Sequence, residues 1–128
     1  MNAKRNAMSN DRLTLSQVVL LAVYAVGMTG GQILFKLAAS SLTGTIGERS
    51  LALVQNLYFL SALALYGALS VFWVWILTFT PLSRAYPFVA LAFALTPALG
   101  AWLFDEAVSL RLILGMLLII CGLFFVTG

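Results

Sequence analysis

The chain has 128 residues, of which 62% are hydrophobic and only 9% are charged, and its mean hydropathy is +1.06. A soluble domain carries about 25% charged residues, so these charges are too few to cover a water-exposed surface, and the composition predicts an integral membrane protein. The absence of histidine and the single cysteine exclude histidine-based metal sites, histidine-dependent catalytic triads and an internal disulfide, and a net charge of +3 gives no sign of nucleic-acid binding.

Four apolar segments follow one another along the chain. A transmembrane helix requires about 20 largely apolar residues, and helices are predicted at about 15–36, 55–79, 86–104 and 109–127 within a single domain, 1–128. A short interfacial helix starting near Arg49 is expected in the longest connection. Pro81 is expected to end the second helix, and Ser83 to cap the third. The sequence therefore predicts an all-α membrane protein with four transmembrane helices.

The basic residues of the connections predict the orientation in the membrane. The apolar run after the leader "MNAKRNAMSNDR" continues to Phe35, longer than the roughly 7–15 residues of a signal-peptide core, so we expect no cleavage. Lysine and arginine favour the cytoplasmic side. An N-terminus inside puts Lys4, Arg5, Arg12 and Arg84 on that side, and Lys36, Arg49 and Arg111 on the other. This narrow excess predicts cytoplasmic termini and leaves antiparallel insertion of some copies open.

The first helix carries a polar stripe. Thr29, Gln32 and Lys36 are spaced i, i+3, i+7 and share one face. Glycines nearby allow either close helix approach or room for a ligand. The stripe faces a solute pathway in one interpretation; in the other, Lys36 lies at a helix end and extends to the lipid headgroups. Gln32 lies about a turn deeper, where a role in a pathway or a contact between helices is expected.

Polar residues flank the third helix. Arg84, beside Tyr86, is a candidate phosphate contact because guanidinium binds phosphate bidentately, and the alternative is a membrane anchor. Asp105 and Glu106 end the helix, where a solvated turn is the alternative to a functional carboxylate. Paired catalytic carboxylates, a nucleophile constellation and a phosphate-binding glycine loop are all missing from the sequence. No enzyme, catalytic residue, cofactor or metal ligand is therefore predicted.

The fourth helix carries Gly115 and Gly122, seven residues apart and therefore on the same face. Such a smooth stripe suits contact between helices, although glycine is also common in membrane helices generally. Four helices make a thin wall around a polar solute, and many transporters place their site between two related repeats. We therefore expect a dimer, with a second copy or a similar four-helix subunit.

The chain resembles a known superfamily over all four predicted helices. The segment "TPLSRAYPFVALAFALTPALGAWLFDEAVSLRLILGMLLIICGLFFV" is similar to the end of a drug/metabolite transporter repeat of the EamA-like type. The features that carry the resemblance are Pro81, the pair Ala85–Tyr86, Glu106, Gly115 and Gly122. The resemblance implies a four-helix half-transporter that works as a dimer.

One branch of that superfamily, the small multidrug resistance family, exports cations as antiparallel dimers. Its glycine pair in the last helix packs the dimer, as Gly115 and Gly122 would here. Its central residue is a first-helix glutamate eight residues before a lysine, and the corresponding position before Lys36 is Met28. A methionine cannot exchange a proton for a cation, so an exporter of organic cations would need another carboxylate, of which Glu106 is the nearest candidate.

The chain also resembles another branch, the subunits that flip aminoarabinose-phosphoundecaprenol across the bacterial inner membrane. Their Gly-Gln-x-x-x-Lys pattern matches Gly31 to Lys36 here. This resemblance implies a flippase for an undecaprenyl-phosphate-linked sugar, in which Gln32 and Lys36 line a groove and Arg84 holds the phosphate, with Tyr86 and Glu106 as further substrate contacts. The cation exporter and a non-transporting subunit that supports a partner are the alternatives.

Overall fold

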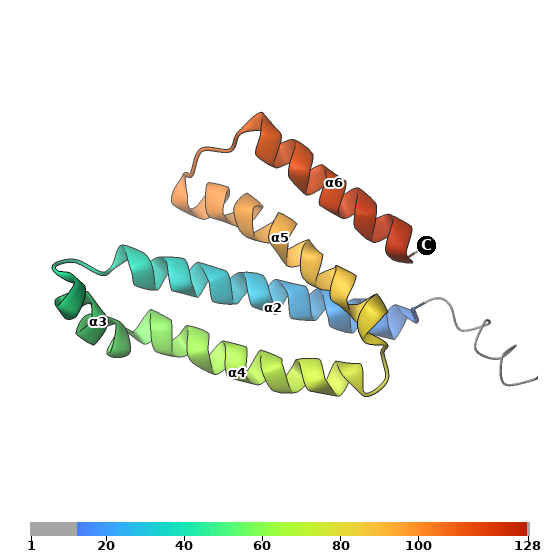
Figure 1. Cartoon of the computed structure of the whole chain (residues 1–128), viewed down its shortest axis with the longest axis horizontal. Helices are drawn as coiled ribbons and strands as arrows, with labels where there is room; N and C mark the ends of the chain where they lie inside the picture. Colours follow the sequence, from blue (N-terminus) through green and yellow to red (C-terminus); the bar gives the residue numbers. More distant parts are fainter. Residues whose placement is uncertain (1–12, 128) are drawn as a thin grey trace, which may run out of the picture.

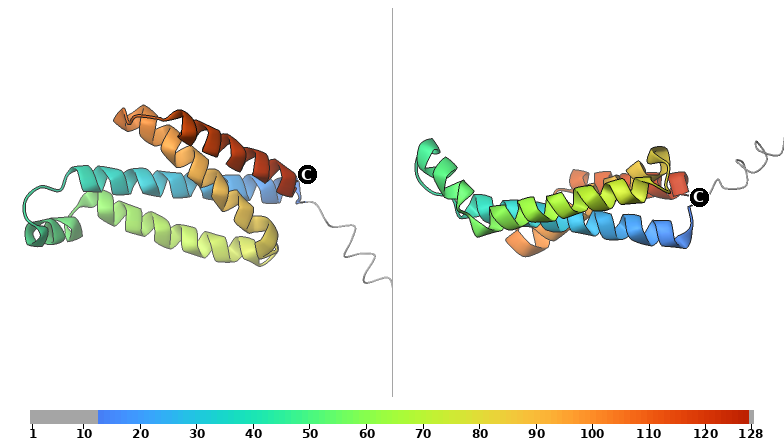
Figure 2. Two further views of the ribbon diagram at one scale, coloured as in Figure 1. Left: turned by 45° about the horizontal axis from the view of Figure 1, so that its top comes forward. Right: turned by 90° about the horizontal axis from the view of Figure 1, so that it is seen from below.

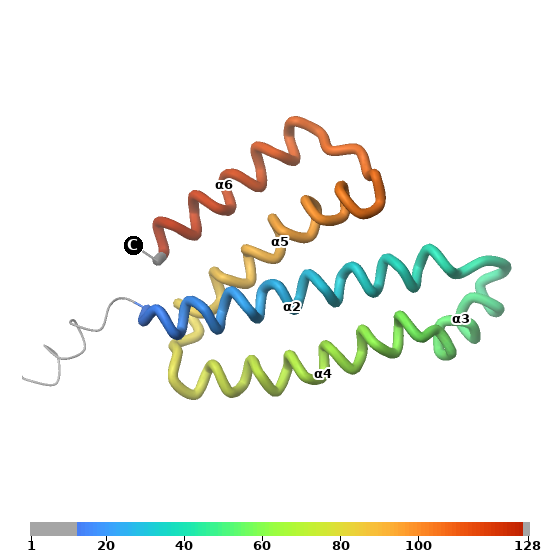
Figure 3. The backbone as a smooth tube through the Cα atoms, turned by 180° about the vertical axis from the view of Figure 1, so that it is seen from behind, coloured from blue at the N-terminus to red at the C-terminus, as the bar shows by residue number. Residues whose placement is uncertain are grey.

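The computed structural model describes residues 13–127, which form five helices. In chain order these are α2 (Leu15–Ser40), α3 (Ile46–Val54), α4 (Leu57–Leu77), α5 (Leu82–Phe104) and α6 (Leu110–Thr127). α2 lies between α4 and α5 and packs against both, whereas α6 packs mainly against α5 (Figures 1 and 3). Lys4, Arg5 and Arg12, on which the predicted orientation partly depends, lie outside the described residues.

Three helices have the length and composition of membrane spans. α2, α4 and α5 contain 26, 21 and 23 residues and are apolar enough to cross a bilayer. α6 is equally apolar but has only 18 residues, or about 27 Å of helix at 1.5 Å per residue, slightly less than the ~30 Å hydrocarbon core. Three of the four predicted spans are therefore supported by length and composition, and α6 falls just short of that length.

Side-chain hydrogen bonds tie the start of α2 to the turn between α4 and α5. Thr14 and Gln17 form a reciprocal capping box at the start of α2. The Gln17 amide nitrogen also donates to the Phe79 carbonyl (3.0 Å) and to the Thr80 hydroxyl (3.2 Å). A cluster of buried residues packs at this end of the bundle, comprising Leu21, Ile76, Ala85 and Phe88. This end is therefore closed by both polar and apolar contacts.

Glycines bring α2 and α4 into close contact. A Cβ atom on Gly31 would lie 2.5 Å from Cε2 of Tyr66, and one on Gly27 would lie 2.8 Å from Cδ2 of Leu69. The absence of these side chains lets α4 residues lie directly on the α2 backbone. Of the two roles predicted for the glycines, the contacts therefore show close helix approach.

Two helix boundaries differ from the sequence-based prediction. α5 begins at Leu82, one turn earlier than predicted, with Pro81 at its N-cap position. Ser83 lies inside the first turn, so its predicted role as a cap is wrong. The fixed φ of proline suits a helix start. The helix continues through Pro87, whose ring eliminates only the hydrogen bond to the Ser83 carbonyl.

The short helix α3 starts at Ile46, three residues before the predicted start. Thr45 precedes it, and both the backbone N–H and the hydroxyl of Thr45 donate to Oε2 of Glu48, at 2.8 and 2.9 Å. These two hydrogen bonds, the backbone one foremost, hold the pKa of the Glu48 carboxyl below its ordinary value. The ionised capping box fixes where α3 begins.

The Gly31 contact predicts how the bundle responds to one added methyl group. Gly31→Ala is expected to lower the thermal-unfolding midpoint in detergent, because the new Cβ forces the Tyr66 ring away from α2. Gly67→Ala on α4 is the matched control: a Cβ there meets nothing within 4 Å, and alanine favours a helix over glycine by about 1 kcal/mol. Equal midpoints for the two variants would contradict the close α2–α4 contact.

Candidate functional site

The C-terminal part of α5 diverges from α2 (Figure 1). Residues of these two helices line a groove between them. It consists of an inner cavity of ≈ 260 Å³ and an outer cavity of ≈ 420 Å³. Gln32, Thr96 and Pro97 line both cavities, so the two adjoin. We call their union the α2–α5 groove. It extends from Val89 on α5 to Glu106 in the connection between α5 and α6.

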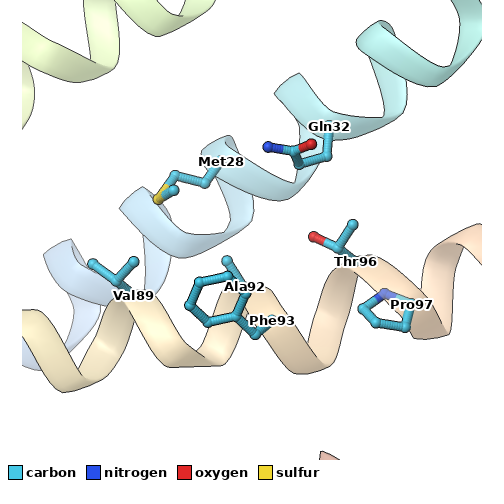
Figure 4. A pocket seen from close by; sticks show the side chains of 7 residues that line it. All are labelled: Met28, Gln32, Val89, Ala92, Phe93, Thr96 and Pro97. Carbon is cyan, nitrogen blue, oxygen red and sulfur yellow. The ribbon is translucent and has the colours of Figure 1, made fainter. Parts of the chain in front are cut away.

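The inner cavity combines an apolar wall with a few polar groups. Figure 4 shows Met28 and Gln32 on α2 facing a row of α5 side chains, with the Gln32 amide and the Thr96 hydroxyl on opposite sides of the cavity. Pro97 has no backbone N–H, so the Phe93 carbonyl in this part of α5 lacks its usual helical hydrogen bond. The inner cavity can therefore accept or donate hydrogen bonds within an otherwise apolar surface.

The α4 helix positions Gln32. Its amide nitrogen donates to the Tyr66 hydroxyl at 2.8 Å, and that hydroxyl is 3.4 Å from the Met28 carbonyl, to which it donates. The Tyr66 ring stacks on Phe35, with centroids 5.4 Å apart. A primary amide has two N–H donors and a carbonyl acceptor. Because Tyr66 uses one donor, the other donor and the carbonyl are left for a ligand.

An ion pair lies at the outer end of the groove. The Lys36 ammonium lies 2.6 Å from Oε1 of Glu106 and 5.9 Å from the centroid of the Phe104 ring. The two charged side chains are 51% and 49% exposed. Asp105, in a left-handed conformation with φ 53°, turns the chain at the end of α5, immediately before Glu106. The pair therefore bridges the end of α2 and the connection to α6.

Exposed aromatic residues indicate where the groove lies in the membrane. Tyr86 near the start of α5 is 63% exposed, and Trp102 near its end is 78% exposed. The two positions are 16 residues apart, which corresponds to about 24 Å of helix. Such side chains concentrate at membrane–water interfaces. We therefore infer that the Lys36–Glu106 pair lies at headgroup depth, and Gln32 with Thr96 within the hydrocarbon.

The structure brings together only part of the predicted site. Gln32, Lys36 and Glu106 line one groove. Because α2 and α5 run in the same direction (Figure 1), the half-buried Arg84 and the exposed Tyr86 lie at the opposite end of the bundle. Arg84 is about 18 Å along α5 from Thr96.

Thr29 corrects the predicted polar stripe. Its side chain is 2% exposed, and its hydroxyl donates to the Ala25 carbonyl at 3.0 Å. Its hydrogen bond is therefore satisfied within α2, and the residue does not line the groove.

Sequence reasoning missed Tyr66, Thr96 and Pro97. The Thr96–Pro97 pair in the middle of an apolar run was a detectable signal, because a proline there frees a carbonyl beside a hydroxyl. Tyr66 had no such signal, since its role depends on the register of α4 against α2.

The predicted packing glycines of α6 face open space within this chain. A Cβ atom on Gly115 or on Gly122 would meet nothing within 4 Å. Neither glycine therefore serves a close helix contact among the described residues, and the role in a dimer stays a prediction.

The Tyr66 hydroxyl is expected to hold the Gln32 amide in place. Tyr66→Phe removes one acceptor and one donor while keeping the stacked ring, and should reduce the free energy of unfolding by about 0.5–1.5 kcal/mol. Tyr58→Phe, at an exposed position of the same helix, is the control and should have little effect. Chemical unfolding in detergent measures both, and equal stabilities would show that the hydrogen bond contributes nothing.

Comparison with known proteins gives one informative match. No family model matches the chain, and no solved structure matches it significantly. The chain is similar to the "Probable 4-amino-4-deoxy-L-arabinose-phosphoundecaprenol flippase subunit ArnE" of Sodalis glossinidius (strain morsitans), with 44% identity over 63 residues. The match covers 49% of this chain and 56% of the relative, so the chain spans just over half of that protein's length. Over about half of its length, the chain is therefore similar to a protein named as a flippase subunit.

Proposed function

We propose that this chain is a subunit of a bacterial inner-membrane flippase that translocates an undecaprenyl-phosphate-linked sugar. The observation that carries the proposal is that both polar residues of the Gly-Gln-x-x-x-Lys pattern, Gln32 and Lys36, line the same groove between two apolar helices. The similarity to a named flippase subunit supports it.

The chemistry of the groove suits a lipid with a polar, anionic head. Moving such a head through hydrocarbon is costly unless its charge and hydroxyls find partners. Lys36 supplies a cation for the phosphate, and Gln32 with Thr96 supplies hydrogen bonds for the sugar. The apolar wall of Met28 and Phe93 keeps the pathway compatible with lipid, and the polyprenyl tail stays in the bilayer.

Arg84 is proposed to hold the phosphate where the lipid enters the pathway, with Tyr86 beside it. The start of α2, the turn before α5 and the end of α6 all lie at the same end of the bundle (Figure 2). We propose that this end is cytoplasmic and that α6 is a fourth span. The groove reaches Val89, just over one helical turn beyond Arg84, so the head would pass from Arg84 to Gln32 and then to Lys36.

The working unit is proposed to be a dimer of four-helix chains of the EamA-like type. The relative's name includes the word subunit. In one chain, α2 forms one wall of the groove and α5 forms the other, and a second chain would enclose the remaining sides. The α6 face with Gly115 and Gly122, which is open in this chain, would pack against a second copy or a similar subunit.

Export of small organic cations is the second candidate, because Glu106 places a carboxylate in the groove. Two features weigh against it. Met28 stands where the cation exporters have their central glutamate, and the Lys36 ammonium already neutralises Glu106 at 2.6 Å.

Loss of the proposed contacts should slow translocation in living cells. Lys36→Ala and Arg84→Ala are each expected to reduce the rate about tenfold or more, because charge-assisted contacts are worth about 1.5–3 kcal/mol, and Gln32→Ala should reduce it less. In cells expressing each variant, a membrane-impermeant reagent that reacts with amines measures the amount of 4-amino-4-deoxy-arabinosyl lipid that reaches the outer leaflet of the inner membrane.

Arg49→Ala is the matched control for these substitutions. It removes the same charge at the same end of the bundle as Lys36, but Arg49 lies on the exposed helix α3 outside the groove. Wild-type rates in the Lys36, Arg84 and Gln32 variants would contradict the proposed pathway.

A double substitution on α6 tests whether Gly115 and Gly122 form the dimer contact. Replacing Gly115 and Gly122 together by leucine should abolish dimer formation, because the bulky side chains block close approach of a second helix. The folded chain should remain intact, since a Cβ atom at either position meets nothing within 4 Å. Native mass spectrometry gives the oligomeric state and thermal melting gives the stability. An intact dimer in the double variant would place the contact elsewhere.

A further inference from the structure

The Lys36–Glu106 pair gives the groove one charge of each sign. Among the described residues that line the groove, these two alone are charged. They lie in the outer cavity of ≈ 420 Å³, within the range of roughly 300–1,000 Å³ that is typical of small-molecule sites. The mouth of the groove is therefore dipolar and carries no net charge.

A head group that carries only a phosphate is poorly matched to this pair. To reach Lys36 it must displace Glu106, which then remains beside a second anion. A head that carries only a cation meets the converse problem with Lys36. Binding sites commonly reject a ligand by placing a like charge beside it.

A head group with both charges avoids this problem. It replaces one ion pair, 2.6 Å long, by two pairs and leaves neither protein charge without a partner. We propose that the groove selects a zwitterionic lipid head, in which Lys36 binds the phosphate and Glu106 binds a primary ammonium group on the sugar. This inference rests on the proposed flippase function and makes Glu106 the residue that determines specificity.

Lys36 and Glu106 can each exchange the other for a charged group of the ligand. Each side chain is about half exposed, and an ion pair so accessible to solvent contributes little to stability. Lys36 reaches the pair through a flexible four-carbon stem, and Glu106 belongs to the connection between two helices. Opening the pair therefore disturbs no helix, while Gln32 and Thr96 stay in place for the sugar hydroxyls.

The chemical class of the ligand agrees with the relative. The lipid in that protein's name carries an amino group at position 4 of its sugar and a phosphate linked to the same sugar. A groove that holds one cation and one anion suits that combination better than it suits the phosphate of a sugar without an amino group.

The test compares two lipids that differ at one position of the sugar, where one carries an ammonium group and the other an uncharged acetamide. The purified protein, with any subunit that accompanies it, is placed in nanodiscs and titrated with 4-amino-4-deoxy-arabinosyl phosphoundecaprenol and with its N-acetyl derivative. Native mass spectrometry measures both affinities. The wild type should bind the amine about tenfold more tightly or better, as expected for one charge-assisted contact.

Three variants separate the roles. Glu106→Gln should bind both lipids equally, and should bind the N-acetyl lipid at least as tightly as the wild type does, because no carboxylate is left beside the phosphate. Glu106→Asp should keep part of the preference for the amine. Lys36→Gln should weaken both lipids alike. Asp105→Asn is the matched control, because it removes the neighbouring carboxylate, which does not line the groove. Asparagine tolerates the left-handed backbone at this position. This variant should therefore prefer the amine as strongly as the wild type does.

Each outcome bears on one proposal. A preference for the amine that survives in Glu106→Gln, or a wild type that binds both lipids equally, overturns the zwitterion inference while lipid binding itself still supports the flippase. A wild type that binds neither lipid overturns the flippase proposal. Unchanged thermal midpoints in the Glu106 variants exclude misfolding as the cause of a lost preference.

Discussion

The contact between α2 and α4 is the constraint on which the rest of the bundle depends. Because Gly27 and Gly31 have no side chains, Leu69 and Tyr66 lie directly on the α2 backbone, and α2 is held along most of its length. At one end, Gln17 ties α2 to the turn before α5. α5 is therefore fixed at its start and diverges only toward its C-terminal end, and that divergence opens the groove.

The same contact connects packing to chemistry. Tyr66, which fills the space that Gly31 leaves, also holds the Gln32 amide through its hydroxyl. This polar group of the inner cavity is thus positioned by a helix that does not line the groove. The outer pair, Lys36 and Glu106, is instead held by charge alone at two element ends. The groove therefore combines an inner part with a hydrogen-bonded amide and an outer ion pair accessible to solvent, an arrangement suited to a ligand that must bind and then leave.

Much of the architecture follows from local features of the sequence. Long apolar runs become helices because hydrocarbon cannot satisfy backbone polar groups, and the runs predicted here match α2, α4 and α5, with α6 slightly short. The Gly-Gln-x-x-x-Lys pattern pointed to Gln32 and Lys36, which do line one groove. Helical spacing predicted that Thr29 shares the polar face of Gln32 and Lys36, but its hydroxyl instead bonds to the backbone of its own helix. The predicted start of α5 was one turn late, because proline permits the helix to begin at Leu82.

Composition and hydrophobic length were thus enough to establish a helical membrane protein, because both depend only on the transfer of side chains and peptide groups between water and lipid. Which polar residues meet was decided by the tertiary structure. Lys36 and Glu106 are 70 residues apart in the sequence, and their meeting depends on the path of α5 relative to α2. Arg84 lies at the far end because those two helices run in the same direction. Such contacts depend on helix register and direction, which are set by packing between helices rather than by the period within any one of them.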